Sequence, residues 1–385
     1  MVNPSKARIA VIAMFMLNGG LFGIWASRVP AIRAGLALSY GELGVALLCL
    51  GAGAICAFPI AGRVVDQRGA APVTRALALI YGPALLGIAL AVNLWTLGLA
   101  LFVFGAVHGA MDVAMNGWGA EVERRTARPF MSFFHAMFSL GAGLGALSGW
   151  LAASWGISPR LHFLLAGGFL AVVCIRATRI AWQSDRAQPA AGRLFTLPHG
   201  PLALVGLVAF CASLGEGAMA DWGAIFLREI AGASEGMAAL GYAVFSVAMV
   251  TVRLIGDQIS RYFGTVMAAR LGGACSAAGV LMAVLLGSYP AALAGFALMG
   301  IGYAVVMPLA FSRAANDPDT SPGRALAGVA TLGYGGMLMG PPFLAALAWA
   351  SSLRISFLIM AVLSLVIVAA AGVLAPANKR PGGRP

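Results

Sequence analysis

The sequence predicts an all-α membrane protein with twelve transmembrane helices, arranged as two pseudo-symmetric bundles of six helices each. Three observations support this fold class. Hydrophobic residues make up 61% of the chain and charged residues 10%, whereas a soluble domain carries about 25% charged residues. Long apolar runs recur along the whole chain, and its two halves share a weak internal repeat. One soluble core could not bury so many apolar runs.

The apolar runs match the length of membrane helices. A helix needs about 20 mostly apolar residues to cross the hydrocarbon layer of a bilayer. Glycine-rich stretches within these runs, such as 17–23 and 139–149, allow neighbouring helices to approach closely. Twelve runs are long enough to span: 8–28, 41–62, 73–93, 96–118, 130–153, 159–180, 200–222, 236–256, 265–287, 290–312, 325–349 and 353–375.

The formal net charge of +12 follows membrane topology, so we expect no nucleic-acid partner. With the N-terminus in the cytoplasm, nearly all Lys and Arg residues fall on the inner side, as the positive-inside rule requires. The exceptions on the outer side are Arg28, Arg33, Arg160, Arg228 and Arg354. The pattern predicts a bacterial cytoplasmic (inner) membrane, with both termini in the cytoplasm. Separately, we expect a monomer.

The longest polar connection divides the chain into two halves. It predicts an N-terminal bundle of residues 1–180, a cytoplasmic linker of residues 181–199 and a C-terminal bundle of residues 200–385. The halves echo each other at two pairs of positions, Trp25 with Trp222 and Asp66 with Asp257. A half-length repeat with an even number of spans is typical of many secondary transporters.

The loop after the second span carries the most specific motif, GRVVDQRG at residues 62–69. It resembles a loop signature of the major facilitator superfamily, with Gly62 and Asp66 matching and Gln67 in place of a basic residue. Three further segments resemble YbjJ-type inner-membrane proteins near the fucose-permease branch of that superfamily: WASRVP (25–30), DVAMN (112–116) and EGAMADW (216–222). The resemblance implies the major facilitator fold and transport by alternating access.

Polar residues inside the spans are the candidates for function. His108, Asp112 and Asn116 are spaced four apart, so they lie on one face of the fourth span. A carboxyl group at this depth costs about 2.5–3.5 kcal/mol, and burial disfavours its charged form. Such a group can take up and release a proton, and the branch resemblance implies this role for Asp112. We predict Asp112, Glu216 and His135 as proton-coupling residues; the alternative is that they only hydrogen-bond neighbouring helices.

Hydrogen-bonding and aromatic side chains in the spans fit a sugar-like substrate. The predicted substrate-binding residues are Asn18, Trp25, His108, Asn116, Tyr242, Tyr303 and Tyr334. Tryptophans near span ends, among them Trp25, Trp118 and Trp222, have a second interpretation as an interfacial belt. Methionines in the same spans would equally suit the adaptable wall of a drug exporter.

Charged residues at the span ends are candidate gates. On the outer side, Arg28 and Asp221 could form an ion pair. On the inner side, each of two aspartates could cap a helix N-terminus of the opposite half or pair with a nearby arginine, a contact of about 0.3–1 kcal/mol. The inner gating candidates are Asp66, Arg68, Asp257 and Arg261; simple solvation is the alternative for all six residues.

Several function classes find no support in the sequence. The lysines, Lys6 and Lys379, lie at the two ends of the chain and outside any phosphate-binding loop, and no long extramembrane segment could house a catalytic domain. We therefore expect no enzyme, no catalytic residue and no cofactor. The favoured function is proton-coupled uptake of a small polar solute. The alternatives are proton-coupled efflux of drugs or metabolites, an intramembrane metal site at His108, Asp112 and His135, and a sensor that does not transport.

Overall fold

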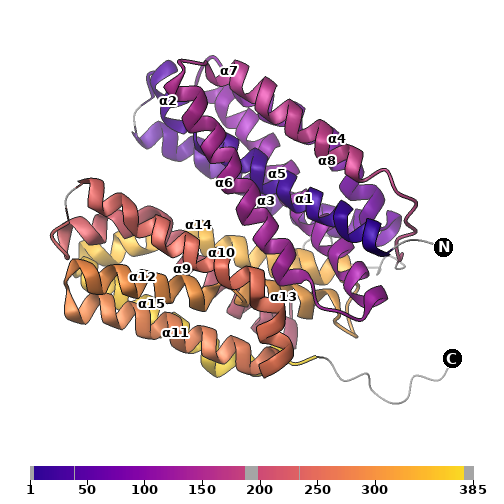
Figure 1. The fold of residues 1–385 in the computed structure, drawn as a ribbon. Coiled ribbons are helices and arrows are strands. Elements are labelled where there is room, and N and C mark those ends of the chain that lie inside the picture. The colour runs from indigo at the N-terminus through magenta and orange to yellow at the C-terminus, as the bar shows by residue number, and fades with distance from the viewer. Residues whose placement is uncertain (1–3, 39, 187–197, 234, 377–385) are drawn as a thin grey trace. The chain divides into compact units, whose positions relative to one another are not determined.

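The structure is a computed structural model that describes residues 4–38, 40–186, 198–233 and 235–376. Every regular element in this part of the chain is a helix (Figure 1). Eleven of the helical segments are long and apolar enough to cross a membrane. The remaining predicted span, 325–349, coincides with α14 (Pro322–Ala350), a helix of 29 residues. The predicted all-α membrane fold class is confirmed.

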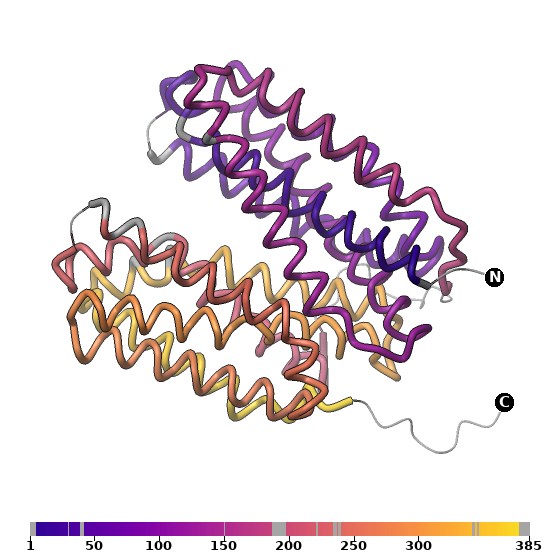
Figure 2. Tube along the Cα trace, viewed as in Figure 1, coloured from indigo at the N-terminus to yellow at the C-terminus, as the bar shows by residue number. Residues whose placement is uncertain are grey.

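The helices occur in chain order as two sets, which Figure 2 traces by colour. The first set is α1 (Pro4–Ala26), α2 (Val29–Gly35), α3 (Tyr40–Arg68), α4 (Ala70–Ile88), α5 (Leu94–Thr126), α6 (Met131–Ser154), α7 (Pro159–His162), the π-helix η1 (Phe163–Gly167) and α8 (Gly168–Ala177). The second set is α9 (Pro201–Glu229), α10 (Glu235–Phe263), α11 (Thr265–Leu286), α12 (Tyr289–Tyr303), α13 (Val306–Ala315), α14, α15 (Leu353–Ala370) and the 3₁₀ helix η2 (Ala371–Leu374).

The chain folds into two compact units. The first contains residues 1–196 together with 321–327, and the second contains residues 197–320 together with 328–385. The opening turns of α14 therefore group with the first unit. Most of the predicted linker, residues 187–197, lies outside the described residues.

Two predicted spans contain an irregularity with α-helix on both sides of it. Span 159–180 contains the π-helix η1 directly after α7, and span 290–312 is interrupted between α12 and α13. Hydropathy reports only how apolar a segment is, so it does not detect either irregularity. Such irregular turns often lie near functional sites.

Glycines bring the helix backbones together as the sequence suggested. A Cβ atom on Gly19 of α1 would overlap the backbone oxygen of Phe138 in α6, and one on Gly141 would overlap that of Met16. In the second unit, Gly279 of α11 and Gly295 of α12 exclude each other's side chains in the same way. Close backbone approach is how helices without a hydrophobic driving force pack in membranes.

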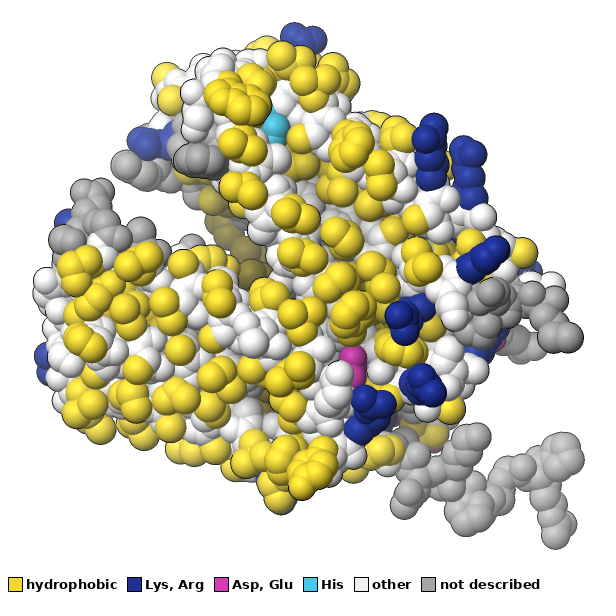
Figure 3. All heavy atoms as spheres, viewed as in Figure 1, with side chains coloured by type: hydrophobic (Ala, Val, Ile, Leu, Met, Phe, Trp, Pro, Cys, Tyr) yellow, Lys and Arg dark blue, Asp and Glu magenta, His cyan; other side chains and the backbone are white. Residues whose placement is uncertain are grey.

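The surface is apolar and the tryptophans divide into two classes. Figure 3 shows hydrophobic side chains over most of the visible face. Trp25 and Trp118 are buried within the protein, so they do not present their rings to lipid and the belt interpretation is wrong for both. The tryptophans that are more than 70% exposed, Trp95, Trp155 and Trp349, all lie near helix ends, where belt residues are expected.

A glycine turn repeats in the two units. Gly69 separates α3 from α4 with φ of +88°, and Gly264 separates α10 from α11 with φ of +78°. Both glycines follow a helix of 29 residues and act as the N-cap of the next helix. The backbone conformation at these positions is one that only glycine adopts easily. This shared turn adds a structural match to the internal repeat.

We predict that Gly69→Ala destabilises the protein more than Gly264→Ala. Both substitutions strain the backbone by about 1–3 kcal/mol. Only the Cβ atom at position 69 would also collide with a side chain, that of Ser184, at 2.5 Å. Thermal unfolding of the detergent-purified protein measures the difference. Gly87→Ala, in open space within α4, is the matched control, and an equal loss for both turn variants would contradict the prediction.

Candidate functional site

A chain of polar side chains runs from α5 to α6 in the first unit. The amide nitrogen of Asn116 donates hydrogen bonds to the backbone oxygen of Asp112 at 2.8 Å and to its Oδ1 at 3.3 Å. The amide oxygen of Asn116 lies 3.2 Å from Nε2 of His135. All three side chains are buried. Asn116 therefore links the predicted proton-coupling residues Asp112 and His135.

His108 has a partner that the sequence analysis missed. Its Nδ1 lies 2.5 Å from the hydroxyl of Tyr81 in α4, and both side chains are buried. The same hydroxyl lies 3.5 Å from the backbone oxygen of Asn18 in α1. Tyr81 belongs to none of the polar stripes that the sequence analysis singled out. Its position in the middle of a span was the available signal.

Some buried polar atoms of this cluster have no hydrogen-bond partner among the described residues. They are Oδ2 of Asp112 and both amide atoms of Asn18. Buried polar groups are nearly always satisfied in native proteins, so each exception requires an explanation. Both side chains could still bind a ligand, a proton or a water molecule.

Aromatic rings surround this polar cluster. The ring of Phe22 lies 5.1 Å from that of His108, and the ring of Phe15 lies 5.3 Å from that of His135. Apolar neighbours lower the local dielectric and strengthen each polar interaction. We define Asn18, Tyr81, His108, Asp112, Asn116 and His135 as the first-unit cluster.

The second unit contains a buried ion pair. One guanidinium nitrogen of Arg253 in α10 donates hydrogen bonds to both carboxylate oxygens of Glu216 in α9. The distance is 3.1 Å to Oε1 and 3.2 Å to Oε2. Arg253 is 6% exposed. The sequence analysis assigned this arginine to the cytoplasmic side and gave it no partner, because a charge near a span end resembles an interfacial residue. Glu216 is therefore not an isolated carboxyl group.

The remaining substrate-binding candidates differ in their surroundings. Trp25 is buried in the first unit. Tyr303 is packed inside the second unit, with its hydroxyl 2.9 Å from Oγ of Ser364. Tyr242 is 46% exposed and Tyr334 is partly exposed. The binding role of these four residues stays a prediction.

Of the two outer gating candidates, only Arg28 has a side chain that the structure describes. The guanidinium of Arg28 donates to the backbone oxygens of Gly149 at 3.2 Å and Ile157 at 2.6 Å. These bonds join the end of α1 to the end of α6 and the turn after it. The side chain of Asp221 lies outside the described residues, so the proposed ion pair stays a prediction.

On the inner side, Asp66 binds the start of α14. Its carboxylate accepts from Oγ of Ser321 at 2.6 Å and from the backbone N–H of Gly323 at 2.9 Å, within the segment that groups with the first unit. A carboxylate at a helix N-terminus satisfies free N–H groups and the helix dipole. Arg68 and Arg261 are exposed and Asp257 is half-buried. Their gating roles stay predictions.

Polar contacts hold the segment after α8 against α5. We call the residues that make them the polar clasp: Glu121, Arg124, Arg125, Trp182 and Asp185. The indole N–H of Trp182 donates to Oε2 of Glu121 at 2.7 Å, and the guanidinium of Arg125 stacks on the indole ring. Arg124 and Arg125 pair with Asp185 at 2.9 and 3.1 Å. Burial raises the pKa of Asp185, but the hydrogen bonds and charges of both arginines outweigh it and hold the pKa below its usual range.

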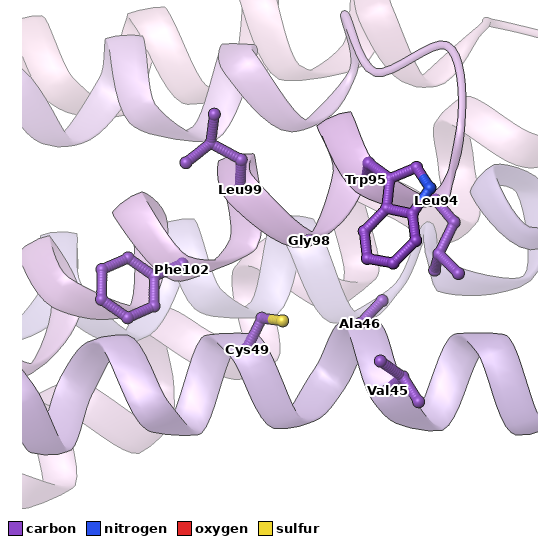
Figure 4. Close-up of a pocket in the computed structure, with 8 residues that line it drawn as sticks. All are labelled: Val45, Ala46, Cys49, Leu94, Trp95, Gly98, Leu99 and Phe102. Carbon is purple, nitrogen blue, oxygen red and sulfur yellow. The ribbon is translucent and has the colours of Figure 1, made fainter.

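Two further features do not add to the site. Among the described residues, no three His, Cys, Asp or Glu side chains come together as metal ligands, so the metal alternative gains no support. Figure 4 shows an apolar surface groove between α3 and α5 that contains none of the predicted site residues. It is lined by Val45, Ala46, Cys49, Leu94, Trp95, Gly98, Leu99 and Phe102.

Comparison with known proteins identifies the family. A family model described as Major Facilitator Superfamily matches residues 10–320. The chain belongs to this superfamily. It is 42% identical over 369 residues to a protein named "Uncharacterized transporter y4wD" of Sinorhizobium fredii, covering 94% of this chain and 97% of that protein. It is 36% identical over 365 residues to an MFS-type transporter of Yersinia pestis, covering 94% and 93%.

A solved structure agrees with the predicted fold. The E. coli fucose:proton symporter FucP superimposes with a TM-score of 0.78, covering 96% of this chain and 98% of that structure at 13% sequence identity. At this identity the likeness shows the fold alone. The protein is thus a membrane transporter of the superfamily, and its multi-pass architecture is established.

We predict that two Asn→Leu variants in the first-unit cluster differ in their effect on the free energy of unfolding. Asn116→Leu removes the link between Asp112 and His135 and should cost about 1–3 kcal/mol. Asn18→Leu removes an amide without partners among the described residues and should be neutral or stabilising, because burying an unpaired amide is itself unfavourable. Thermal unfolding in detergent compares them directly. A loss for Asn18→Leu equal to that for Asn116→Leu would show that the Asn18 amide has a partner.

The stability that the polar clasp contributes should depend on pH through the ionisation of Asp185. A carboxyl group whose pKa is lowered on folding stabilises the protein above its unfolded pKa of about 3.9 and loses this effect as pH falls through the lowered folded pKa. Asp185 is more than half exposed, so we expect Asp185→Asn to cost less than about 1 kcal/mol at pH 7. The difference from wild type should vanish in strong acid. The exposed Asp319→Asn is the control for removing one carboxylate.

Proposed function

We propose that this protein is a proton-coupled secondary transporter that takes up a small polar, sugar-like solute by alternating access. We further propose that it lies in a bacterial cytoplasmic membrane with both termini in the cytoplasm. The observation that carries the proposal is the Asp112 carboxyl group, which is buried in the middle of a spanning helix and keeps one oxygen without a partner among the described residues. Ionisable residues in such positions usually serve a function.

The neighbours of Asp112 support proton uptake and release. Asn116 contacts Oδ1 and leaves Oδ2 available for a proton. No arginine or lysine is paired with Asp112 in the described part of the chain, so no fixed positive charge holds it ionised. His135 lies at the other end of the Asn116 amide and can exchange a hydrogen bond with it. Protonation of Asp112 would then be transmitted to α6 through Asn116.

The substrate class is inferred from the free hydrogen-bonding capacity of the cluster. The Asn18 amide offers two donors and an acceptor that no described residue uses. Phe22 and His108 provide ring faces nearby. Hydrogen-bonding groups beside aromatic faces suit the hydroxyl groups and apolar face of a sugar or polyol. The structural neighbour FucP is named as a fucose:proton symporter, which agrees with this proposal.

The experiment begins with a substrate screen. Thermal shift of the detergent-purified protein is measured against sugars, polyols, organic acids and cationic drugs. Ligands that stabilise the folded protein raise its melting temperature by mass action. We expect sugars or polyols to do so, and Asn18→Leu to abolish the shift without lowering the basal melting temperature. Stabilisation by cationic drugs alone would favour efflux instead.

Transport of the identified solute in proteoliposomes then tests Asp112. We expect Asp112→Asn to lose accumulation driven by a proton gradient and to keep exchange of solute between the two sides, because only the coupling step needs a proton. Asp319→Asn, an exposed carboxylate, should behave as wild type. Undiminished gradient-driven accumulation by Asp112→Asn would remove this residue from the mechanism.

A further inference from the structure

The break between α12 and α13 has a cause in the sequence. In an α-helix, the N–H of residue 308 would bond to the backbone oxygen of Ala304, but residue 308 is proline and has no N–H. The helix stops at Tyr303 and restarts at Val306. The next amide, that of Leu309, bonds normally to Val305 at 3.1 Å. Pro308 therefore leaves the Ala304 oxygen without its helical donor.

Arg253 replaces this missing donor. Its Nε donates to the Ala304 oxygen at 3.2 Å, while another nitrogen of the same guanidinium binds both carboxylate oxygens of Glu216. A free backbone oxygen inside a membrane protein costs several kcal/mol unless a neighbouring group satisfies it. One side chain thus joins the charge pair between α9 and α10 to the break in the neighbouring helix.

Both sides of the break are anchored separately. Tyr303, just before the break, hydrogen-bonds to Ser364 of α15. The sulfur of Met307, just after the break, accepts a hydrogen bond from the hydroxyl of Ser213 at 3.3 Å. Glu216 and Cys211 of α9 are titratable groups near Tyr303. The two helix pieces are therefore fixed at their ends, and the turn at 304–305 is the part that can change.

We propose that Arg253 is a positioning residue that makes the conformation of the break at 304–305 depend on the charge of Glu216. While Glu216 is ionised, its carboxylate holds the guanidinium beside the Ala304 oxygen. When Glu216 is neutral, the charge–charge attraction that holds the guanidinium in this position is lost, because a neutral carboxyl group binds a guanidinium less strongly than a carboxylate does. The Ala304 oxygen then loses its donor and the break loosens.

This link concerns a different unit and different residues from the proton-coupling role of Asp112. Its value for transport rests on the proposed function, since a hinge that responds to protonation serves a proton-coupled transporter. The contacts themselves are independent of any substrate. They are tested on the full chain without a ligand, so failure of this inference and failure of the proposed function give separate results.

The experiment is hydrogen–deuterium exchange of the full-length protein in lipid nanodiscs. We expect Glu216→Gln, which mimics the neutral acid, to speed exchange of peptides spanning 304–312 about fivefold, the size expected for losing one hydrogen bond of ordinary strength. Arg253→Lys, which keeps the charge but lacks Nε, should speed exchange to a similar extent. Adding Glu216→Gln to Arg253→Lys should then have no further effect.

Pro308→Ala provides the decisive control. It restores an N–H that can bond to the Ala304 oxygen, so Glu216→Gln should no longer alter exchange at 304–312 in that background. Glu229→Gln, an exposed glutamate on the same helix as Glu216, should leave exchange unchanged. Peptides covering 108–116 in the first unit report any general loss of stability. The proposal is overturned if Glu216→Gln has no effect at 304–312, or acts equally in the wild-type and the Pro308→Ala backgrounds.

Discussion

The bilayer core offers almost no water to hydrogen-bond, so each polar group placed there must find its partner within the protein. This constraint accounts for most of the contacts in the structure. It explains why the His108 ring lies against the Tyr81 hydroxyl and why Arg253 reaches both a carboxylate and a backbone oxygen. It also makes the exceptions informative. Among the described residues, the unpartnered buried atoms include Oδ2 of Asp112 and both amide atoms of Asn18, which belong to the same polar cluster.

The two units accommodate a buried carboxyl group in different ways. In the first unit, Asp112 is surrounded by neutral groups, and its closest side-chain partner is the amide of Asn116. In the second unit, Glu216 is paired with Arg253, and the guanidinium also compensates for a helix break that Pro308 creates. A carboxyl group among neutral dipoles changes charge more readily than one in an ion pair. The two halves of the internal repeat have therefore diverged in their chemistry while keeping the same helix arrangement and the same glycine turn.

Outside the apolar spans, different forces hold the helices. Asp66 caps the start of α14, and the clasp fixes the segment after α8 through Trp182 and Asp185. The ion pairs of Asp185 are exposed to water and to salt, so each is weak, whereas Asp66, Glu121 and Trp182 are buried.

The sequence by itself determined the fold class, the positions of the spans and the polar face of α5. These follow from apolar length and from the 3.6-residue helical period, both of which are local properties of the chain. It also indicated that helices approach closely at glycine-rich stretches such as 17–23. Only the tertiary structure decided which side chains meet. Spacing along one helix fixes a face but not the helix that covers it, so the partnership of Tyr81 with His108 and of Arg253 with Glu216 was not visible. For the same reason the belt interpretation of Trp25 and Trp118 was wrong, since neighbouring helices bury both rings.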